Sequence, residues 1–180
     1  MASLGLPEVQ SLSDCSTEER ARVLDLLFEP STQLHTLSVE LLGKETFQSY
    51  QDLIASIGVQ LIDLEQSAST SDKEWLDSIL GSHPRLGEKH VESAQSQAEQ
   101  AQLKSGNVEE QHQLAQLNAE YEGTFPGLKY VVFVNGRPRP EIMDDMRARI
   151  KRGDIGKERL EAIKAMCDIA VDRAMKLNRL

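Results

Sequence analysis

Apolar residues recur at spacings of three and four along most of the 180-residue chain, and this spacing restricts its fold more than any other feature. One helical turn takes about 3.6 residues, so residues at these spacings line up on one side of a helix. The clearest case is a run of six: Phe47, Tyr50, Ile54, Ile57, Leu61 and Leu64. The sequence therefore predicts amphipathic helices that bury these sides against one another.

Start and stop signals divide this pattern into separate helices. Ser16 to Glu19 and Ser71 to Glu74 each match a capping box, in which a serine and a glutamate three residues later bond to main-chain N–H groups. Gly43 and Gly81 are placed where a helix ends. Residues 1–12 are expected to be a loose lead-in. The expected helices cover about residues 16–29, 31–42, 46–64, 71–80, 93–103, 107–125, 140–152 and 156–177.

One run, Tyr130 to Val134, is rich in residues that favour strands, and Asn135 and Gly136 end it. No second strand is evident to pair with it. We interpret it as a buried extended segment whose main-chain groups are free to bond something else. The predicted fold is therefore all-α: one domain over residues 1–180, a bundle of about eight helices with one short extended segment.

Charge and composition exclude several classes of protein. The formal net charge is −9, which argues against a partner such as nucleic acid or an anionic membrane, because phosphate binding needs a basic face. Cys15 and Cys167 lie far apart, so neither a disulfide framework nor a zinc site is expected. No apolar run approaches the ~18 residues of a membrane span, and the N-terminus lacks the pattern of a signal peptide. We expect an intracellular protein.

The last three residues, Asn178-Arg179-Leu180, resemble the C-terminal peroxisomal address of a small, a basic and a leucine residue. Asparagine is a poor first residue for that address. The expected location is therefore the peroxisome or the cytoplasm.

The segment with the clearest candidate for acid–base chemistry runs from Gly81 to Gly87. It contains His83, which is followed directly by Pro84. Histidine has the side-chain pKa nearest neutrality, so with a nearby carboxylate such as Glu99 it can serve as an acid or base. Two structural alternatives stay open. A histidine just past a helix can cap that helix, and Ser96 with Glu99 is itself a capping box.

The remaining polar residues carry weaker signals. Arg173, beside an apolar stripe in the last helix, suits either a carboxylate ligand or the protein surface. The other histidines, His35, His90 and His112, lack the spacing of metal ligands and are assigned to surface or packing. No metal site, phosphate-binding loop, dinucleotide fingerprint or nucleophile elbow is present.

These pieces together resemble one family, the 2-oxo-4-hydroxy-4-carboxy-5-ureidoimidazoline (OHCU) decarboxylases of urate degradation. They occur in the family's order over nearly the whole chain. The matching pieces are His83-Pro84-Arg85-Leu86-Gly87, Ser96-Gln97-Ala98-Glu99-Gln100, Leu117-Asn118 with Tyr121 and Phe125, Val131 to Val134 with Pro140-Glu141-Ile142, and Ile169-Ala170 with Arg173.

The resemblance implies an all-helical, homodimeric enzyme that needs no cofactor. It implies that His83 and Glu99 are catalytic. It also implies the following substrate-binding positions: Pro84, Ser96, Gln100, Arg173 and the main chain of Val132 and Val134.

The implied substrate fits a chain without cofactor motifs. Its carboxylate-bearing carbon also bears a hydroxyl and adjoins a C=N bond, so electrons released by loss of CO₂ move to the imine nitrogen. Two alternatives stay open. One is a helical interaction module that keeps the fold without catalysis, in which case His83, Glu99 and Arg173 need not converge on a pocket. The other is a related ureide or imidazoline enzyme with a different substrate.

Overall fold

The computed structural model describes residues 5–88, 91, 93–101 and 106–178. Within these ranges it holds eight α-helices, one short 3-10 helix and no strand, which confirms the all-α prediction. No helix among them is long and apolar enough to cross a membrane. The elements are η1 (Val9–Asp14), α1 (Thr17–Phe28), α2 (Thr32–Lys44), α3 (Tyr50–Gln66), α4 (Thr70–Leu80), α5 (Ala94–Ala101), α6 (Val108–Thr124), α7 (Arg139–Arg152) and α8 (Ile155–Leu177).

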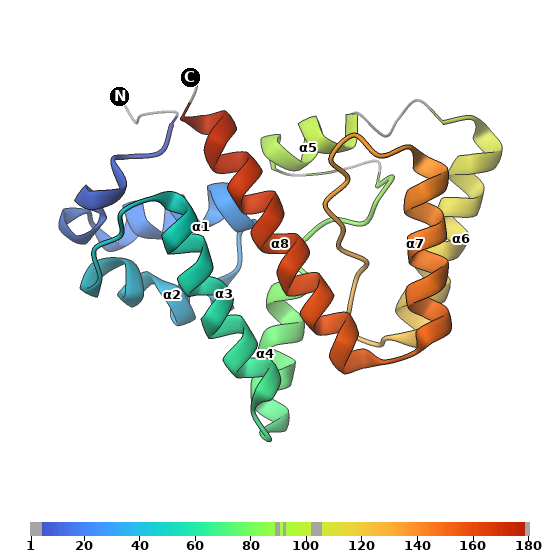
Figure 1. Cartoon of the computed structure of the whole chain (residues 1–180), viewed down its shortest axis with the longest axis horizontal. Helices are drawn as coiled ribbons and strands as arrows, with labels where there is room; N and C mark the ends of the chain where they lie inside the picture. Colours follow the sequence, from blue (N-terminus) through green and yellow to red (C-terminus); the bar gives the residue numbers. More distant parts are fainter. Residues whose placement is uncertain (1–4, 89–90, 92, 102–105, 179–180) are drawn as a thin grey trace.

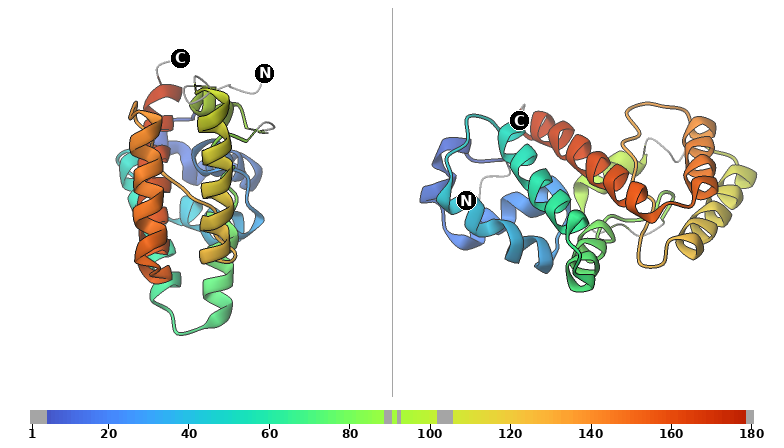
Figure 2. Two further views of the ribbon diagram at one scale, coloured as in Figure 1. Left: turned by 90° about the vertical axis from the view of Figure 1, so that its right-hand side faces the viewer. Right: turned by 60° about the horizontal axis from the view of Figure 1, so that its bottom comes forward.

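The longest helix, α8, runs diagonally through the middle of the molecule (Figure 1). Helices α1, α3 and α4 pack against it on one side, while α6 and α7 pack against each other on the other side. The right-hand view in Figure 2 also separates these two groups. Gly58 lets α3 approach α8 closely, because it has no side chain. A Cβ atom at this position would lie only 3.2 Å from the Cys167 sulfur of α8. Helix α8 therefore lies between the two groups of helices.

Helix boundaries follow the predicted capping signals in part. Ser16 accepts a hydrogen bond from the Glu19 N–H as expected, and Gly81 ends α4 as expected. The capping box predicted at Ser71 is wrong. The helix begins two residues earlier, where the Ser69 side chain accepts a hydrogen bond from the Asp72 N–H. Gly43 lies inside α2 instead of ending it. Serine followed three residues later by aspartate or glutamate recurs often here, so the sequence alone did not identify which serine would cap.

The lead-in predicted for residues 1–12 is wrong from residue 9 onward, because Val9 begins the 3-10 helix η1. Leu12 is fully buried in the core, and its carbonyl accepts a hydrogen bond from Arg20 Nε at 3.0 Å. Val9 is buried as well, Arg20 Nη2 donates to the Ser13 carbonyl at 2.9 Å, and η1 packs against α2, so tertiary contacts hold this region in place. Residues 1–4 lie outside the described part of the chain.

The predicted extended segment is confirmed: residues 128–134 follow α6 without helix or strand. Arginine side chains hold its carbonyl groups. Arg149 Nη1 donates to the Val131 carbonyl at 3.2 Å, and Arg137 Nη2 donates to the Phe133 carbonyl at 2.6 Å. The described residues offer no hydrogen-bond partner to the main-chain N–H and C=O of Val132, which lines a cavity beside α8.

Candidate active site

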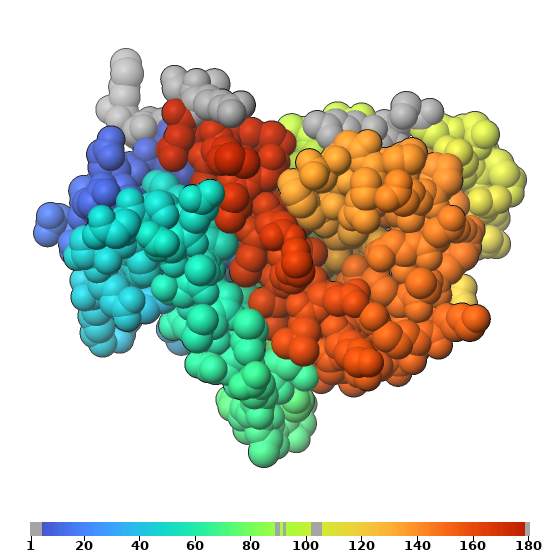
Figure 3. Space-filling view, in the orientation of Figure 1, coloured from blue at the N-terminus to red at the C-terminus, as the bar shows by residue number. Residues whose placement is uncertain are grey.

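A cavity of about 240 Å³ lies between α5, the extended segment and the C-terminal half of α8. Figure 3 shows the surface of the extended segment, in light orange, close to that of α8, in red. The cavity is smaller than the ~300–1,000 Å³ typical of sites for drug-sized ligands, so it suits a small metabolite. Seven of the eight residues expected from the sequence line it: His83, Pro84, Ser96, Glu99, Gln100, Val132 and Val134.

His83 is presented to this cavity by the end of α4. The Ile79 carbonyl of that helix accepts hydrogen bonds from the Ser82 N–H and hydroxyl, whereas the His83 ring bonds to the main chain of Phe28 in another helix. The alternative that His83 caps the helix is therefore not what the structure has. The imidazole is only 5% exposed, and its Nε2 atom has no hydrogen-bond partner among the described residues.

Burial, and next the positive charge of Arg173, lower the pKa of His83 to about 4. A main-chain hydrogen bond with Phe28 acts in the opposite direction, so it stabilises the protonated ring and must involve the Phe28 carbonyl as acceptor. Because Nε2 is unpartnered, Nδ1 is the nitrogen that donates to this carbonyl. At neutral pH the ring is then neutral, and the lone pair of its Nε2 atom has no partner among the described residues.

This low pKa predicts a loss of stability in mild acid. The unfolded chain has an ordinary histidine pKa of 6.5, so below that pH it takes up a proton that the folded state refuses until about pH 4. The stability is complete above about pH 6.5, and the His83 part of it falls by roughly 2 kcal/mol between about pH 7 and about pH 5. Urea unfolding at about pH 7 and about pH 5 measures this loss. A His83→Gln variant should lose roughly 2 kcal/mol less unfolding free energy than the wild type between these pH values. An equal loss in both proteins would contradict the buried neutral ring.

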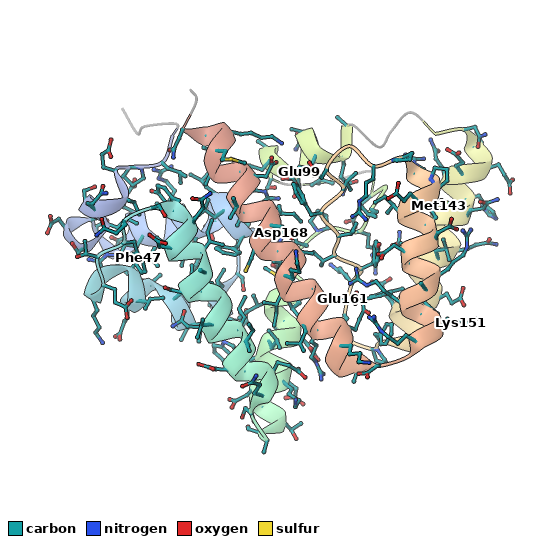
Figure 4. The ribbon with its side chains drawn as sticks, in the orientation of Figure 1. Phe47, Glu99, Met143, Lys151, Glu161 and Asp168 are labelled. Carbon is teal, nitrogen blue, oxygen red and sulfur yellow. The ribbon has the colours of Figure 1, made fainter. Side chains whose placement is uncertain are left out.

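Helix α5 carries the acidic and amide side chains of the site. Ser93 accepts a hydrogen bond from the Ser96 N–H at 3.1 Å, which places Ser96 inside the helix. The alternative that Ser96 and Glu99 form a capping box is therefore not what the structure has. Spacings of three and four place Ser96, Glu99 and Gln100 on one side of the helix. Figure 4 shows Glu99 between α5 and the upper end of α8. The predicted end of this helix near Leu103 lies outside the described residues.

Arg173 of α8 does not line the cavity but lies directly behind Glu99. It is 2% exposed, and its Nε and Nη2 atoms contact the two Glu99 carboxylate oxygens at 2.8 and 3.0 Å. Nη2 also donates to Glu29 at 2.9 Å. The guanidinium is thus held by two carboxylates. Its predicted role as the ligand of a substrate's negative charge stays a prediction.

The polar groups that α5 offers to the cavity are mainly hydrogen-bond acceptors. Gln100 donates its amide to the Arg85 carbonyl at 2.8 Å, which leaves its buried Oε1 atom without a partner among the described residues. The Ser96 hydroxyl donates to the Glu29 carboxylate. The Val132 N–H is a donor on the opposite wall. The site therefore suits a ligand that is rich in N–H groups on one edge and carries oxygen atoms on the other.

Three charged residues at the site were not predicted. Asp172 and Lys176 line the cavity and form an ion pair at 2.5 Å, and Glu29 supports Arg173 from behind. The first two lie at helical spacing from Ile169, so the periodicity of α8 could have placed them beside the recognised arginine. No sequence signal pointed to Glu29, which follows the last residue of α1, far from the other site residues.

The remaining histidines match their assignment to surface or packing where the structure describes them. His35 pairs with Asp25, and His112 is exposed. His90 lies outside the described residues. Within the described ranges, no group of three or more histidine, cysteine, aspartate or glutamate side chains is arranged to hold a metal ion.

Comparison with known proteins assigns the chain to a family. A family model described as OHCU decarboxylase matches residues 13–175. No curated protein matches the sequence. The fold is similar to a solved structure described as "Crystal structure of (S)-allantoin synthase", with a TM-score of 0.63 and 19% identity. The match covers 94% of this chain and 54% of that one, so this chain spans about half the length of that protein.

Proposed function

The chain belongs to the OHCU decarboxylase family, and on this basis we propose that it converts OHCU to (S)-allantoin and CO₂ in urate catabolism. The observation that carries the proposal is the convergence of His83, Glu99 and Gln100 on one cavity of metabolite size. The interaction-module alternative gave no reason for these side chains to meet. Arg173, although outside the cavity, is bonded to Glu99 directly behind it.

The reaction needs positioning and proton transfer. When the carboxylate leaves as CO₂, the electron pair of the broken C–C bond forms a C=C bond to the ureido-bearing carbon. The π electrons of the former C=N bond then move to the nitrogen, which takes a proton. The resulting enol loses its hydroxyl proton while the ureido-bearing carbon gains one, which gives allantoin. A protein must therefore accept the hydroxyl proton and deliver another proton to one face of the ring.

His83 is the proposed proton acceptor. Its ring is neutral at physiological pH because burial lowers its pKa, and its Nε2 lone pair has no protein partner among the described residues. The hydrogen bond of the ring with the Phe28 main chain fixes which nitrogen is available. A base that stays unprotonated at pH 7 and is held in one orientation suits removal of the substrate's hydroxyl proton.

The acceptor groups on α5 are the proposed site for the ureido N–H groups. Glu99 and the Gln100 Oε1 atom offer negative charge and a lone pair along one edge of the cavity. On the other wall, the N–H groups of Val132 and Val134 are proposed to donate to substrate oxygens. Lys176, which also lines the cavity and is paired with Asp172, is proposed to lie near the negatively charged carboxylate.

The test is an assay with freshly made substrate. OHCU is generated from urate with the two preceding enzymes, and (S)-allantoin is followed by circular dichroism. We expect added protein to speed its formation and to yield a single enantiomer. If the protein changes neither the rate nor the enantiomer ratio, the proposal is wrong. A panel of other ureides and imidazolines in the same assay separates OHCU from the alternative of a different substrate.

Two further properties are proposed and need their own tests: the homodimer that the resemblance implies, and a peroxisomal location suggested by the last three residues. A homodimer should elute at about twice the monomer mass in size-exclusion chromatography with light scattering. A peroxisomal location depends on Asn178-Arg179-Leu180, whose last two residues lie outside the described part of the chain. A fluorescent fusion with and without this tripeptide distinguishes the peroxisome from the cytoplasm.

A further inference from the structure

Glu29 has a main-chain conformation that glutamate rarely adopts. It follows α1 directly, with φ at 92° and ψ at 148°. Pro30 comes next, and a residue before proline is pushed away from the helical conformation. Glycine is the residue that takes positive φ without steric cost, and it commonly ends helices for that reason. A glutamate here needs an explanation from its side chain.

The Glu29 side chain is buried and joins three helices. The residue is 4% exposed. One carboxylate oxygen accepts hydrogen bonds from the Ser93 hydroxyl at 2.8 Å, from the Ser96 hydroxyl and from Arg173 Nη2 at 2.9 Å. Burial would raise the pKa of Glu29, but these hydroxyls and the charge of Arg173 hold it below its usual value. Glu29 is therefore an ionised carboxylate inside the protein.

These contacts decide how Ser96 faces the cavity. A serine hydroxyl has a single proton, and here it is donated to Glu29. Ser96 also accepts a hydrogen bond from Arg173 Nη2 at 3.0 Å, which leaves one lone pair. Ser96 can then receive a hydrogen bond from a ligand but cannot donate one. Glu29 thus gives Ser96 the same acceptor character that Glu99 and Gln100 have.

The same carboxylate fixes the position of Glu99. Arg173 lies between Glu29 and Glu99 and contacts both. Without Glu29, the guanidinium would keep a single carboxylate partner and would be free to move with it. The preceding residue, Phe28, bonds to the His83 ring through its main chain. The end of α1 is thereby connected to His83, Ser96 and, through Arg173, Glu99, but not to Gln100, Lys176 or the extended segment.

We infer that Glu29 is a positioning residue for the decarboxylation, and this inference rests on the proposed function. It does not line the cavity. Its carboxylate orients the Ser96 hydroxyl as a hydrogen-bond acceptor and anchors Arg173, which in turn holds Glu99 toward the substrate.

Two variants test this role. Glu29→Gly removes the carboxylate and relieves the strained main chain, and Glu29→Gln keeps the shape without the charge. We expect both to lower kcat/KM by about 10- to 100-fold, as for loss of a hydrogen bond to a charged group, and to raise KM. The matched control is Glu45→Gly, because Glu45 also follows a helix directly but is exposed and has a negative φ of −110°. It should keep wild-type kinetics.

A double-mutant cycle separates positioning from a general effect on the fold. If Glu29 acts through Ser96, then Glu29→Gln should cost clearly less in a Ser96→Ala background than in the wild type. Thermal unfolding identifies which variants are folded. A folded Glu29→Gly or Glu29→Gln variant with wild-type kcat/KM overturns the inference, as does full additivity with Ser96→Ala. An inactive wild-type protein would instead contradict the proposed function itself.

Discussion

Replacing His83 with asparagine is expected to lower kcat/KM for OHCU decarboxylation by about 10²- to 10⁴-fold, the range of a positioned general base. Asparagine is of similar size, and its amide can still donate to the Phe28 carbonyl, so the fold should be kept. It has no basic nitrogen to take the hydroxyl proton. Initial rates are measured against the spontaneous decay of the substrate.

A matched control is His35→Asn. His35 is partly exposed, pairs with Asp25 and does not line the cavity, so its loss should leave kcat/KM unchanged. Circular dichroism spectra of both variants report whether the helices are intact. A folded His83→Asn protein that keeps the wild-type rate would remove His83 from the mechanism without touching the assignment of the family.

Replacing Glu158 with alanine is expected to cost about 3–5 kcal/mol of stability. Glu158 is fully buried and receives hydrogen bonds from Tyr121 at 2.5 Å and from Arg149 Nε at 2.7 Å. Without it, the buried guanidinium of Arg149 loses its main counter-charge. The total free energy of unfolding of a small protein is only ~5–15 kcal/mol, so urea unfolding should detect this loss clearly.

Glu161→Ala is the control for this variant. Glu158 pairs with two arginines, Arg149 and Arg152. Glu161 pairs with the same two arginines, but its side chain is 40% exposed. Exposed ion pairs contribute ~0–1 kcal/mol, so the control should unfold near the wild type. Equal losses in the two variants would mean that burial of Glu158 does not determine its importance. Arg149 also bonds to the Val131 carbonyl, so reduced activity of the Glu158 variant would report movement of the extended segment.

Helix content could be predicted well because it depends on neighbours in the sequence. Spacings of three and four gave the helices, and glycine with a left-handed main chain ended α7 at Gly153 as expected. Residues 9–14 were not predicted, because their order comes from the contact of Leu12 with the core and not from their own propensity. The choice among neighbouring serines as helix caps was likewise decided by packing.

The sequence by itself determined that this chain is helical, and its resemblance to a family indicated that His83, Glu99 and their neighbours serve a common site. Only the tertiary structure decided that Arg173 lies behind Glu99 and that Glu29 joins them. Arg173 and Glu29 are 144 residues apart, and their contact depends on how α1 and α8 pack. Local propensities carry no information on such a contact. A buried charge requires a partner nearby in space, and that partner can come from any part of the chain.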